Sequence, residues 1–312
     1  MITCCGEALI DMIPSPNQHA YTPHCGGSVF NTTIALGRLN IPTAFFSGLS
    51  SDTFGDKIRS TLAKCNVDSS LCVTRNNNTT LTFVTLTNGE AKYAFYDDQT
   101  AGQLLSSADL PDIPQNITTL FFGGISLFRE PCGTAYETLL LREAKTRVIV
   151  IDPNIRVAAI DDEEQYRARL SRLFAASDIV RVSDEDLHWI LPGTQTLETK
   201  ALSLLESGPS TVILTRGADG ALGFTSEGVR AEAPTYPAKI QDTVAAGDTF
   251  NAGVLAELWR SGFLKKGRAI PADVLVSAMR YGALAASITV SRSGANPPWL
   301  YELEKPYPVL PR

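Results

Sequence analysis

Residues 242–253 read DTVAAGDTFNAG, so three small residues lie between two aspartates, directly before a helical pattern. Apolar residues recur at helical spacing from Phe250 to Trp259, and we expect a helix that begins near Gly247. Residues 245–248 supply the first N–H groups of this helix, and none of them has a side chain large enough to block a phosphate. The helix dipole adds positive potential there. The segment therefore predicts an anion-binding site at a helix N-terminus.

Asp248 lies at the edge of that predicted site. A carboxylate beside a bound phosphoryl group is well placed to take the proton from an attacking hydroxyl. The alternative is that Asp248 only caps the helix, since Asp is a favoured cap residue and Asn251 could complete the turn. The segment alone leaves both interpretations open.

Composition favours a soluble enzyme. The 312 residues are 44% hydrophobic and can bury one large core, so we expect a single domain over residues 1–312. A net charge of −6 without a Lys/Arg run argues against nucleic-acid or anionic-membrane partners. There is no basic leader and no run of about 18 apolar residues, which predicts a cytoplasmic protein without a membrane partner.

Short apolar runs alternate with helical patterns along the chain. We expect buried strands at 43–49, 118–122, 147–151, 178–182 and 211–215. We expect helices at 29–39, 54–65, 133–145, 165–176, 197–207 and 272–289. This rhythm predicts an α/β fold of three layers, in which a mostly parallel sheet is covered on both faces and ligands bind at the carboxyl ends of the strands.

One region departs from this rhythm. Residues 80–87 and 90–96 flank Asn88-Gly89, a pattern typical of a β-hairpin with a tight turn. Together, residues 12–25 and 80–100 are expected to form a small β-sheet lid over the site, which would keep water from an activated phosphate. The alternatives are a hairpin that packs on the core and a hairpin that forms a homodimer interface.

A Gly-Gly pair precedes the first predicted helix. Residues 25–31 read CGGSVFN, and Gly26 and Gly27 would let the backbone approach a ligand closely. Asn31 falls in the first turn of the helix, where its amide can bind sugar hydroxyls. Because such pairs are common in loops, this signal is weak by itself.

The two motifs resemble the signatures of the ribokinase, or PfkB, family of carbohydrate kinases, DTxGAGD and GGxxxN, with Ala245 in place of the first Gly of GAGD. The DPNIR segment at 152–156 resembles the family's DxNxR, SDED at 183–186 stands where NxxE is usual, and TRGADG at 215–220 resembles TxGxxG. The order of these motifs spans nearly the whole chain. The resemblance implies a ribokinase-like fold with a lid and the phosphorylation of a sugar by ATP, with Mg²⁺ and K⁺ as ions.

The resemblance also implies roles for individual residues. The base would be Asp248, beside an anion hole formed by Ala245, Ala246 and Gly247. The sugar would be bound by Asp11, at the end of the first strand, and by Gly26, Gly27, Asn31 and Arg156. ATP would be bound by Ser183, Asp186, Thr215, Gly217, Gly220 and Asn251. The monovalent cation would be held by Asp242 and Val244, and Asp186 would act on Mg²⁺ indirectly.

The substrate is predicted from a weaker likeness. Residues 95–102 resemble the FYRxxTAD stretch of fructokinase-like members, with Asp97 in place of Arg and Gly102 in place of Asp, so we expect fructose. A 2-keto-3-deoxygluconate kinase ranks second, because Asp97 and Asp98 would repel the acid if they face the pocket, and a ribokinase is a further alternative.

Three other classes of protein fit the sequence less well. A nicotinamide-dependent oxidoreductase is disfavoured because no GxGxxG follows the first strand, and a P-loop phosphotransferase because GxxxxGK[ST] is absent. A non-catalytic kinase-fold sugar-binding protein would not need Asp248. The sequence therefore predicts a carbohydrate kinase.

Overall fold

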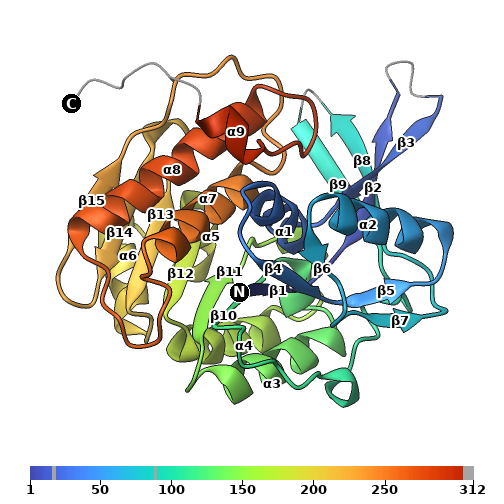
Figure 1. The fold of residues 1–312 in the computed structure, drawn as a ribbon, viewed down its shortest axis with the longest axis horizontal. Coiled ribbons are helices and arrows are strands. Elements are labelled where there is room, and N and C mark those ends of the chain that lie inside the picture. Colours follow the sequence, from blue (N-terminus) through green and yellow to red (C-terminus); the bar gives the residue numbers. More distant parts are fainter. Residues whose placement is uncertain (16–18, 88–89, 305–312) are drawn as a thin grey trace.

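The computed structural model describes residues 1–15, 19–87 and 90–304, and its main feature is a nine-stranded sheet (Figure 1). The order across this sheet is β15 (Arg230–Ala233), β14 (Ala221–Thr225), β13 (Thr211–Thr215), β12 (Ile179–Ser183), β11 (Val148–Asp152), β10 (Thr119–Gly123), β1 (Ile2–Cys5), β4 (Thr43–Phe46) and β6 (Val67–Asp68). The strands from β13 to β6 are parallel, and β14 and β15 add an antiparallel edge. The prediction of a mostly parallel sheet is confirmed.

Alternating side chains build two hydrophobic cores, one on each face of this sheet. On β11, Val148 and Val150 join one core, while Ile149 and Ile151 join the other. The first core is covered by α1 (Ser28–Arg38), α2 (Thr53–Lys64), α7 (Ala246–Arg260) and α8 (Ala272–Val290). The second is covered by α3 (Cys132–Glu143), α4 (Glu163–Ala176), α5 (Asp184–Ile190) and α6 (Leu197–Glu206). The three-layer fold is therefore as predicted.

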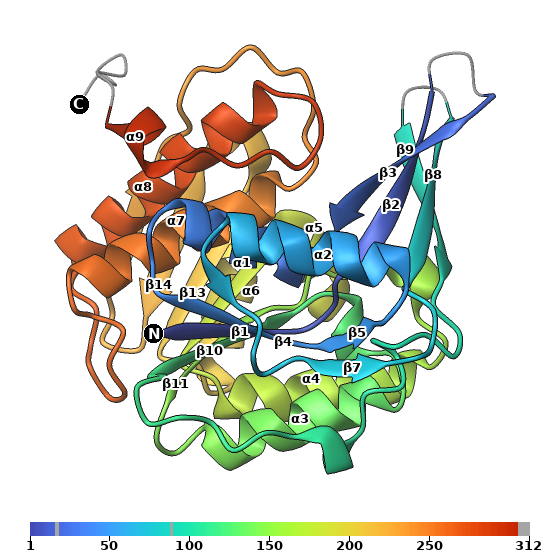
Figure 2. The ribbon, with the colours of Figure 1, turned by 45° about the vertical axis from the view of Figure 1, so that its right-hand side comes forward.

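A second, smaller sheet stands apart from the main one and forms the lid (Figure 2). Its order is β3 (Tyr21–Gly26), β2 (Leu9–Pro14), β8 (Leu81–Thr87) and β9 (Glu90–Tyr96). The antiparallel pairing of β8 with β9 confirms the two strands of the predicted hairpin, whose turn at 88–89 lies outside the described residues.

The remaining elements are short. A two-stranded sheet pairs β5 (Gly48–Ser50) with β7 (Val73–Arg75), and α9 (Leu300–Leu303) follows α8. Four 3₁₀ turns among the described residues are η1 (Ser107–Asp109), η2 (Ile125–Leu127), η3 (Val157–Ala159) and η4 (Gly217–Asp219).

Two strand predictions were wrong in detail. The run 43–49 is not one strand, because the carbonyl of Ser47 accepts a hydrogen bond from Val73 and the chain passes there from the main sheet to the two-stranded sheet. Asp11 does not end the first strand, because β1 stops at Cys5 and Asp11 belongs to the lid strand β2. The changes of sheet fall at Ser47-Gly48 and at Gly6-Glu7, short polar or glycine breaks that the prediction read through.

Helix α8 is, among the described residues, the one helix long and apolar enough to cross a membrane by length and composition, with a mean hydropathy of 1.2. Half of that window is buried inside the protein, where the helix packs on α7, β14 and β15. Core packing accounts for its apolar composition.

Candidate active site

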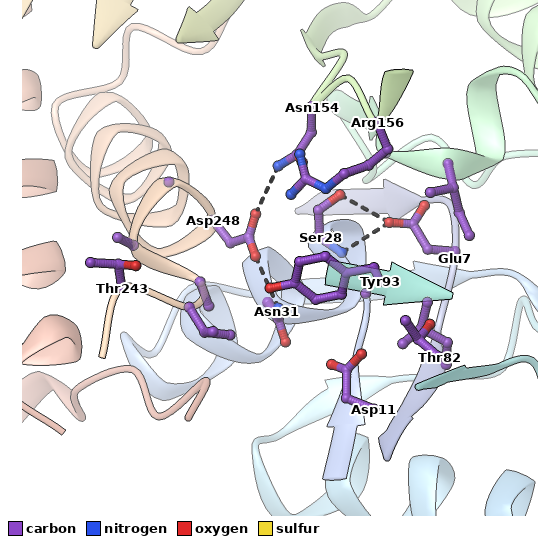
Figure 3. Close-up of a pocket in the computed structure, with 18 of the residues that line it drawn as sticks. Glu7, Asp11, Ser28, Asn31, Thr82, Tyr93, Asn154, Arg156, Thr243 and Asp248 are labelled. Carbon is purple, nitrogen blue, oxygen red and sulfur yellow. Dashed lines mark hydrogen bonds between the residues drawn. The ribbon is translucent and has the colours of Figure 1, made fainter. Parts of the chain in front are cut away.

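A cavity of about 770 Å³ opens where the carboxyl ends of the parallel strands, the N-terminus of α7 and the inner face of the lid meet (Figure 3). Many predicted site residues line it, namely Asp11, Gly27, Asn31, Arg156, Asp242, Val244, Ala245, Ala246, Gly247 and Asp248. The residues predicted for ATP, together with Gly26, are not among those that line it. The structure thus brings the predicted base, anion hole and sugar residues to one cavity.

The predicted anion hole lies at the start of α7. The helix begins at Ala246, one residue before the predicted start, and no side chain caps it. Its N-cap residue, Ala245, has a left-handed backbone with φ of 59°. The N–H of Ala246 donates to the carbonyl of Thr243 at 3.2 Å. The other N–H groups of an uncapped first turn that faces a cavity, with the positive end of the helix dipole, suit a phosphate.

Asp248 is buried at the centre of the site and does not cap its helix. Its Oδ2 accepts a hydrogen bond from Asn31 Nδ2 at 2.9 Å, and its Oδ1 accepts one from Asn154 Nδ2 at 3.4 Å, as Figure 3 shows. Burial raises the pKa of Asp248 to about 7, although the bond from Asn31 lowers it. A carboxylate with a pKa near neutrality matches the needs of a general base.

Asp11 and the Gly-Gly pair fit together at the other end of the cavity. A Cβ on Gly26 would lie 2.0 Å from Asp11 Oδ2, so only glycine allows this carboxylate its position. Gly27 has φ of 104°, a conformation open mainly to glycine. Burial raises the pKa of Asp11 to about 6. The pair therefore shapes the wall against which Asp11 is held.

Glu7 lines the cavity but was missed as a site residue. Its Oε1 accepts hydrogen bonds from the backbone N–H and the hydroxyl of Ser28, both at 2.9 Å. It thereby caps α1, whose own N-cap residue, Gly27, provides no side chain. Burial raises the pKa of Glu7. Because Glu7 and Ser28 are far apart in the sequence, the only available signal was a helix that starts at glycine without a cap.

The predicted ATP residues do not line the cavity. Ser183 and Asp186 form a capping box at the start of α5, and Asp186 Oδ1 also accepts the N–H of Ile155 at 2.9 Å. Burial, and the nearby Asp152, raise the pKa of Asp186. Asn251 Nδ2 donates to Asp152 Oδ2 at 2.6 Å. Carboxylate oxygens are the donors that Mg²⁺ prefers, so Asp186 suits a nearby ion chemically, whereas Asp152 is paired with Arg181.

The predicted nucleotide loop is exposed at its tip. Gly217 has φ of 53° and open space around its Cα, while a Cβ on Gly220 would lie 2.3 Å from the carbonyl oxygen of Ala233. Thr215 ends β13 just before this loop. The loop follows the carboxyl end of a strand, as the α/β architecture requires for a ligand-binding segment.

At the predicted cation site, both carboxylate oxygens of Asp242 accept backbone N–H groups. Asp242 Oδ1 accepts the N–H of Val244 at 3.0 Å, and Asp242 Oδ2 accepts the N–H of Gly294 at 2.8 Å. The N–H of Asp242 reaches the carbonyl of Val290 at 3.2 Å. The loop before α7 and the turn after α8 are thus joined through one carboxylate, and cation binding there stays a prediction.

The lid contributes a row of side chains to the cavity. Asp11, Thr82 and Phe95 are register partners across β2, β8 and β9, and all three line the cavity together with Tyr93. Asp97, by contrast, forms an ion pair with Arg129 at 2.6 Å. Neither Asp97 nor Asp98 lines the cavity. The predicted repulsion of an acidic substrate required them to face the cavity, so it does not apply.

Comparisons with known proteins agree with this site. Residues 1–300 match the pfkB family of carbohydrate kinases. The chain is 48% identical over 270 residues to a fructokinase of Rhizobium leguminosarum bv. trifolii, covering 85% of this chain and 82% of that protein. It is 28% identical to fructokinase-2 of Oryza sativa subsp. japonica, covering 95% and 90%. The structure resembles an ATP-bound fructokinase from Xylella fastidiosa with a TM-score of 0.88 at 26% identity, covering 97% and 96%.

The chain therefore belongs to the pfkB family of carbohydrate kinases. It is a kinase with a ribokinase-like fold, and the predictions of family, fold and enzyme class are confirmed.

Proposed function

We propose that this protein transfers the γ-phosphoryl group of ATP to a hydroxyl of fructose. The main support is the position of the buried Asp248 carboxylate. It lies between an uncapped helix N-terminus and the part of the cavity formed by Asp11, Asn31 and the lid, which would hold a sugar. The similarity to a fructokinase at 48% identity supports fructose among the sugars. A sugar-binding protein without catalysis would have no need of the buried base.

The geometry supports a simple mechanism. Asp248 would take the proton of the attacking hydroxyl, while the N–H groups at the start of α7 and the exposed Arg156 would stabilise charge on the phosphoryl group. Phosphoryl transfer depends mainly on alignment and electrostatics. The lid side chains Tyr93 and Phe95 would limit the access of water and so reduce hydrolysis of ATP.

Two ions belong to this proposal. Mg²⁺, when bound with ATP, neutralises phosphate charge, and Asp186 would position it through water. K⁺ would bind beside Asp242 and the carbonyl of Val244, where it would order the loop that precedes the anion hole.

Other substrates are less well matched. The cavity is lined by the acidic residues Glu7, Asp11, Asp242 and Asp248, against the single basic residue Arg156. A 2-keto-3-deoxygluconate carboxylate would meet more negative than positive charge there, which disfavours it for a reason other than the one predicted from Asp97 and Asp98. Ribose remains the neutral alternative.

We also propose a cytoplasmic homodimer that associates through the outer face of the lid. Tyr21 and Tyr96 pack edge-to-face on Phe83 at 5.1 and 5.2 Å, and Tyr96 is 62% exposed. These rings lie on the face opposite to Thr82 and Phe95, because neighbours in a strand point to opposite sides. Light scattering of wild type and Tyr96→Asp tests this, since a wild-type monomer would contradict it.

The substrate proposal is tested by a panel of fructose, ribose, 2-keto-3-deoxygluconate and nucleosides with ATP and Mg²⁺. We expect fructose to give the highest kcat/KM. A preference for another substrate by more than about tenfold, roughly 1.4 kcal/mol in transition-state binding, would contradict fructose while leaving the kinase intact.

A further inference from the structure

A buried arginine lies directly behind the anion hole. Arg181, on β12, is only 7% exposed. A Cβ on Gly247 would lie 3.0 Å from its Nη2 and 3.1 Å from its Nη1. Because glycine has no Cβ, the guanidinium group can pack against the backbone of the first turn of α7. A permanent positive charge is thus held against the peptide groups that would receive a phosphate.

One carboxylate and one hydroxyl fix this guanidinium group. Arg181 Nη1 donates to Asp152 Oδ2 at 2.9 Å, and Nη2 donates to Thr215 Oγ1 at 2.5 Å. Asp152, which is 2% exposed, also accepts the side chain of Asn251 on α7. The ion pair therefore ties the helix to the carboxyl ends of β11, β12 and β13.

Stability alone does not account for this arrangement. Removing two charges from water offsets most of their attraction, so a buried ion pair adds little to stability compared with neutral residues of similar size. Arg181 Nε, moreover, has no hydrogen-bond partner among the described residues. A buried charge that adds little to stability and lies behind the proposed site of phosphoryl transfer points to an electrostatic role.

We propose that Arg181 is a positioning residue that strengthens the anion hole from behind and, in balance with Asp152, sets the charge around Asp248. This inference rests on the proposed function of the site. It assigns Gly247 a second task, since a Cβ there would crowd the guanidinium group and push it away from the first turn of α7.

The charges that face Asp248 come from several elements. Arg181 on β12 and Arg156 after β11 are positive, while Asp152 on β11 is negative, and the neighbouring helix α1 contributes the neutral Asn31. The lid adds the phenol of Tyr93, and Asp186 of α5 lies beyond Asp152. Arg181 lowers the pKa of Asp248 and Asp152 raises it, so removing each charge should have opposite effects.

The first test compares the pH dependence of kcat/KM in Arg181→Lys, Arg181→Gln and Asp152→Asn. On the acidic side of the profile, kcat/KM falls as Asp248 is protonated. We expect the midpoint of this fall to stay near its wild-type pH in Arg181→Lys, to move up by about 0.5 pH unit or more in Arg181→Gln and to move down in Asp152→Asn. A purely structural role would reduce activity without opposite shifts. The proposal would be overturned if Arg181→Lys and Arg181→Gln had the same acidic midpoint. It would also be overturned if the midpoints of Arg181→Gln and Asp152→Asn moved in the same direction.

The second test needs no turnover and so separates this inference from the proposed reaction. A non-hydrolysable ATP analogue with Mg²⁺ is titrated calorimetrically into each variant, and Arg181→Gln should bind it at least about fivefold more weakly than Arg181→Lys. Equal affinities would overturn the inference. If Arg181→Gln does not fold, Asp152→Asn decides, since the unbalanced arginine should tighten binding, and unchanged or weaker binding would contradict us.

Discussion

Asn31 Nδ2 donates a hydrogen bond of 2.9 Å to Asp248 Oδ2, joining the first turns of two helices that are 217 residues apart in the sequence. The amide orients the carboxylate toward the cavity and stabilises its charged form. The two family motifs thus meet in space, with the loop proposed to bind the sugar in contact with the proposed base.

This contact predicts a shift in the pH profile. Asp248 must be ionised to accept a proton, so wild-type kcat/KM should rise with pH through about 7. Asn31→Ala removes a bond that lowers the pKa of Asp248, so the rise of kcat/KM should move to higher pH. We expect kcat/KM to be lower than wild type by roughly tenfold or more near pH 7 and by less near pH 9.

Thr32→Val is the matched control for Asn31→Ala. It removes a bond from the Thr32 hydroxyl to the backbone carbonyl of Asp248, at 3.2 Å, but leaves the carboxylate untouched. We expect its rise of kcat/KM to stay at the wild-type pH. The same shift in both variants would show that general loosening, and not the amide, sets the profile.

The raised pKa of Asp248 also predicts a change in stability with pH. Between the unfolded pKa near 3.8 and the folded value near 7, the folded state binds the extra proton, so wild-type stability contributed by this group falls as pH rises. Asp248→Asn lacks this titration. Its Tm relative to wild type should increase between about pH 5 and pH 8, and a constant difference would refute the raised pKa.

Ala245 predicts an unusual gain from glycine. A left-handed alanine costs roughly 1 kcal/mol, so Ala245→Gly should be neutral or stabilising by up to about that amount in urea unfolding. Ala246→Gly, one residue later in the helix, should instead lose about 0.5–1 kcal/mol. Equal losses in both variants would be inconsistent with the left-handed cap.

The cation site makes a separate prediction. Turnover should be higher in K⁺ than in tetramethylammonium, and Asp242→Asn should lose most of this difference because Asp242 links Val244 to Gly294. Steady-state rates in the two buffers measure the effect. Equal wild-type rates would remove K⁺ from the account.

Much of the fold was predictable because its signals are local. The runs that became β10, β11, β12 and β13 are short, apolar and separated by helical patterns, and the helix after Gly247 began within one residue of its predicted start. Strands β14 and β15 were missed. In β15 alternate residues are exposed, and β14 is buried throughout but short, with Gly223 at its centre.

The site was predictable where one motif carries the chemistry, as in Asp248 and Asn31. The contacts among Asp152, Arg181 and Asn251 were not, because they join three segments that only the folded sheet brings together. For Glu7 the only signal was indirect, a helix that starts at Gly27 without a side-chain cap. Asn154 was within a recognised motif, but its contact with Asp248 depends on tertiary geometry.

The central claim is that Asp248 is the base of a sugar kinase, and kcat of Asp248→Asn with fructose, ATP and Mg²⁺ tests it most directly. The substitution keeps size and removes the base, so kcat should fall roughly 10²- to 10⁴-fold while the affinity for ATP is largely kept. A variant that retains more than about a tenth of wild-type kcat would contradict the mechanism.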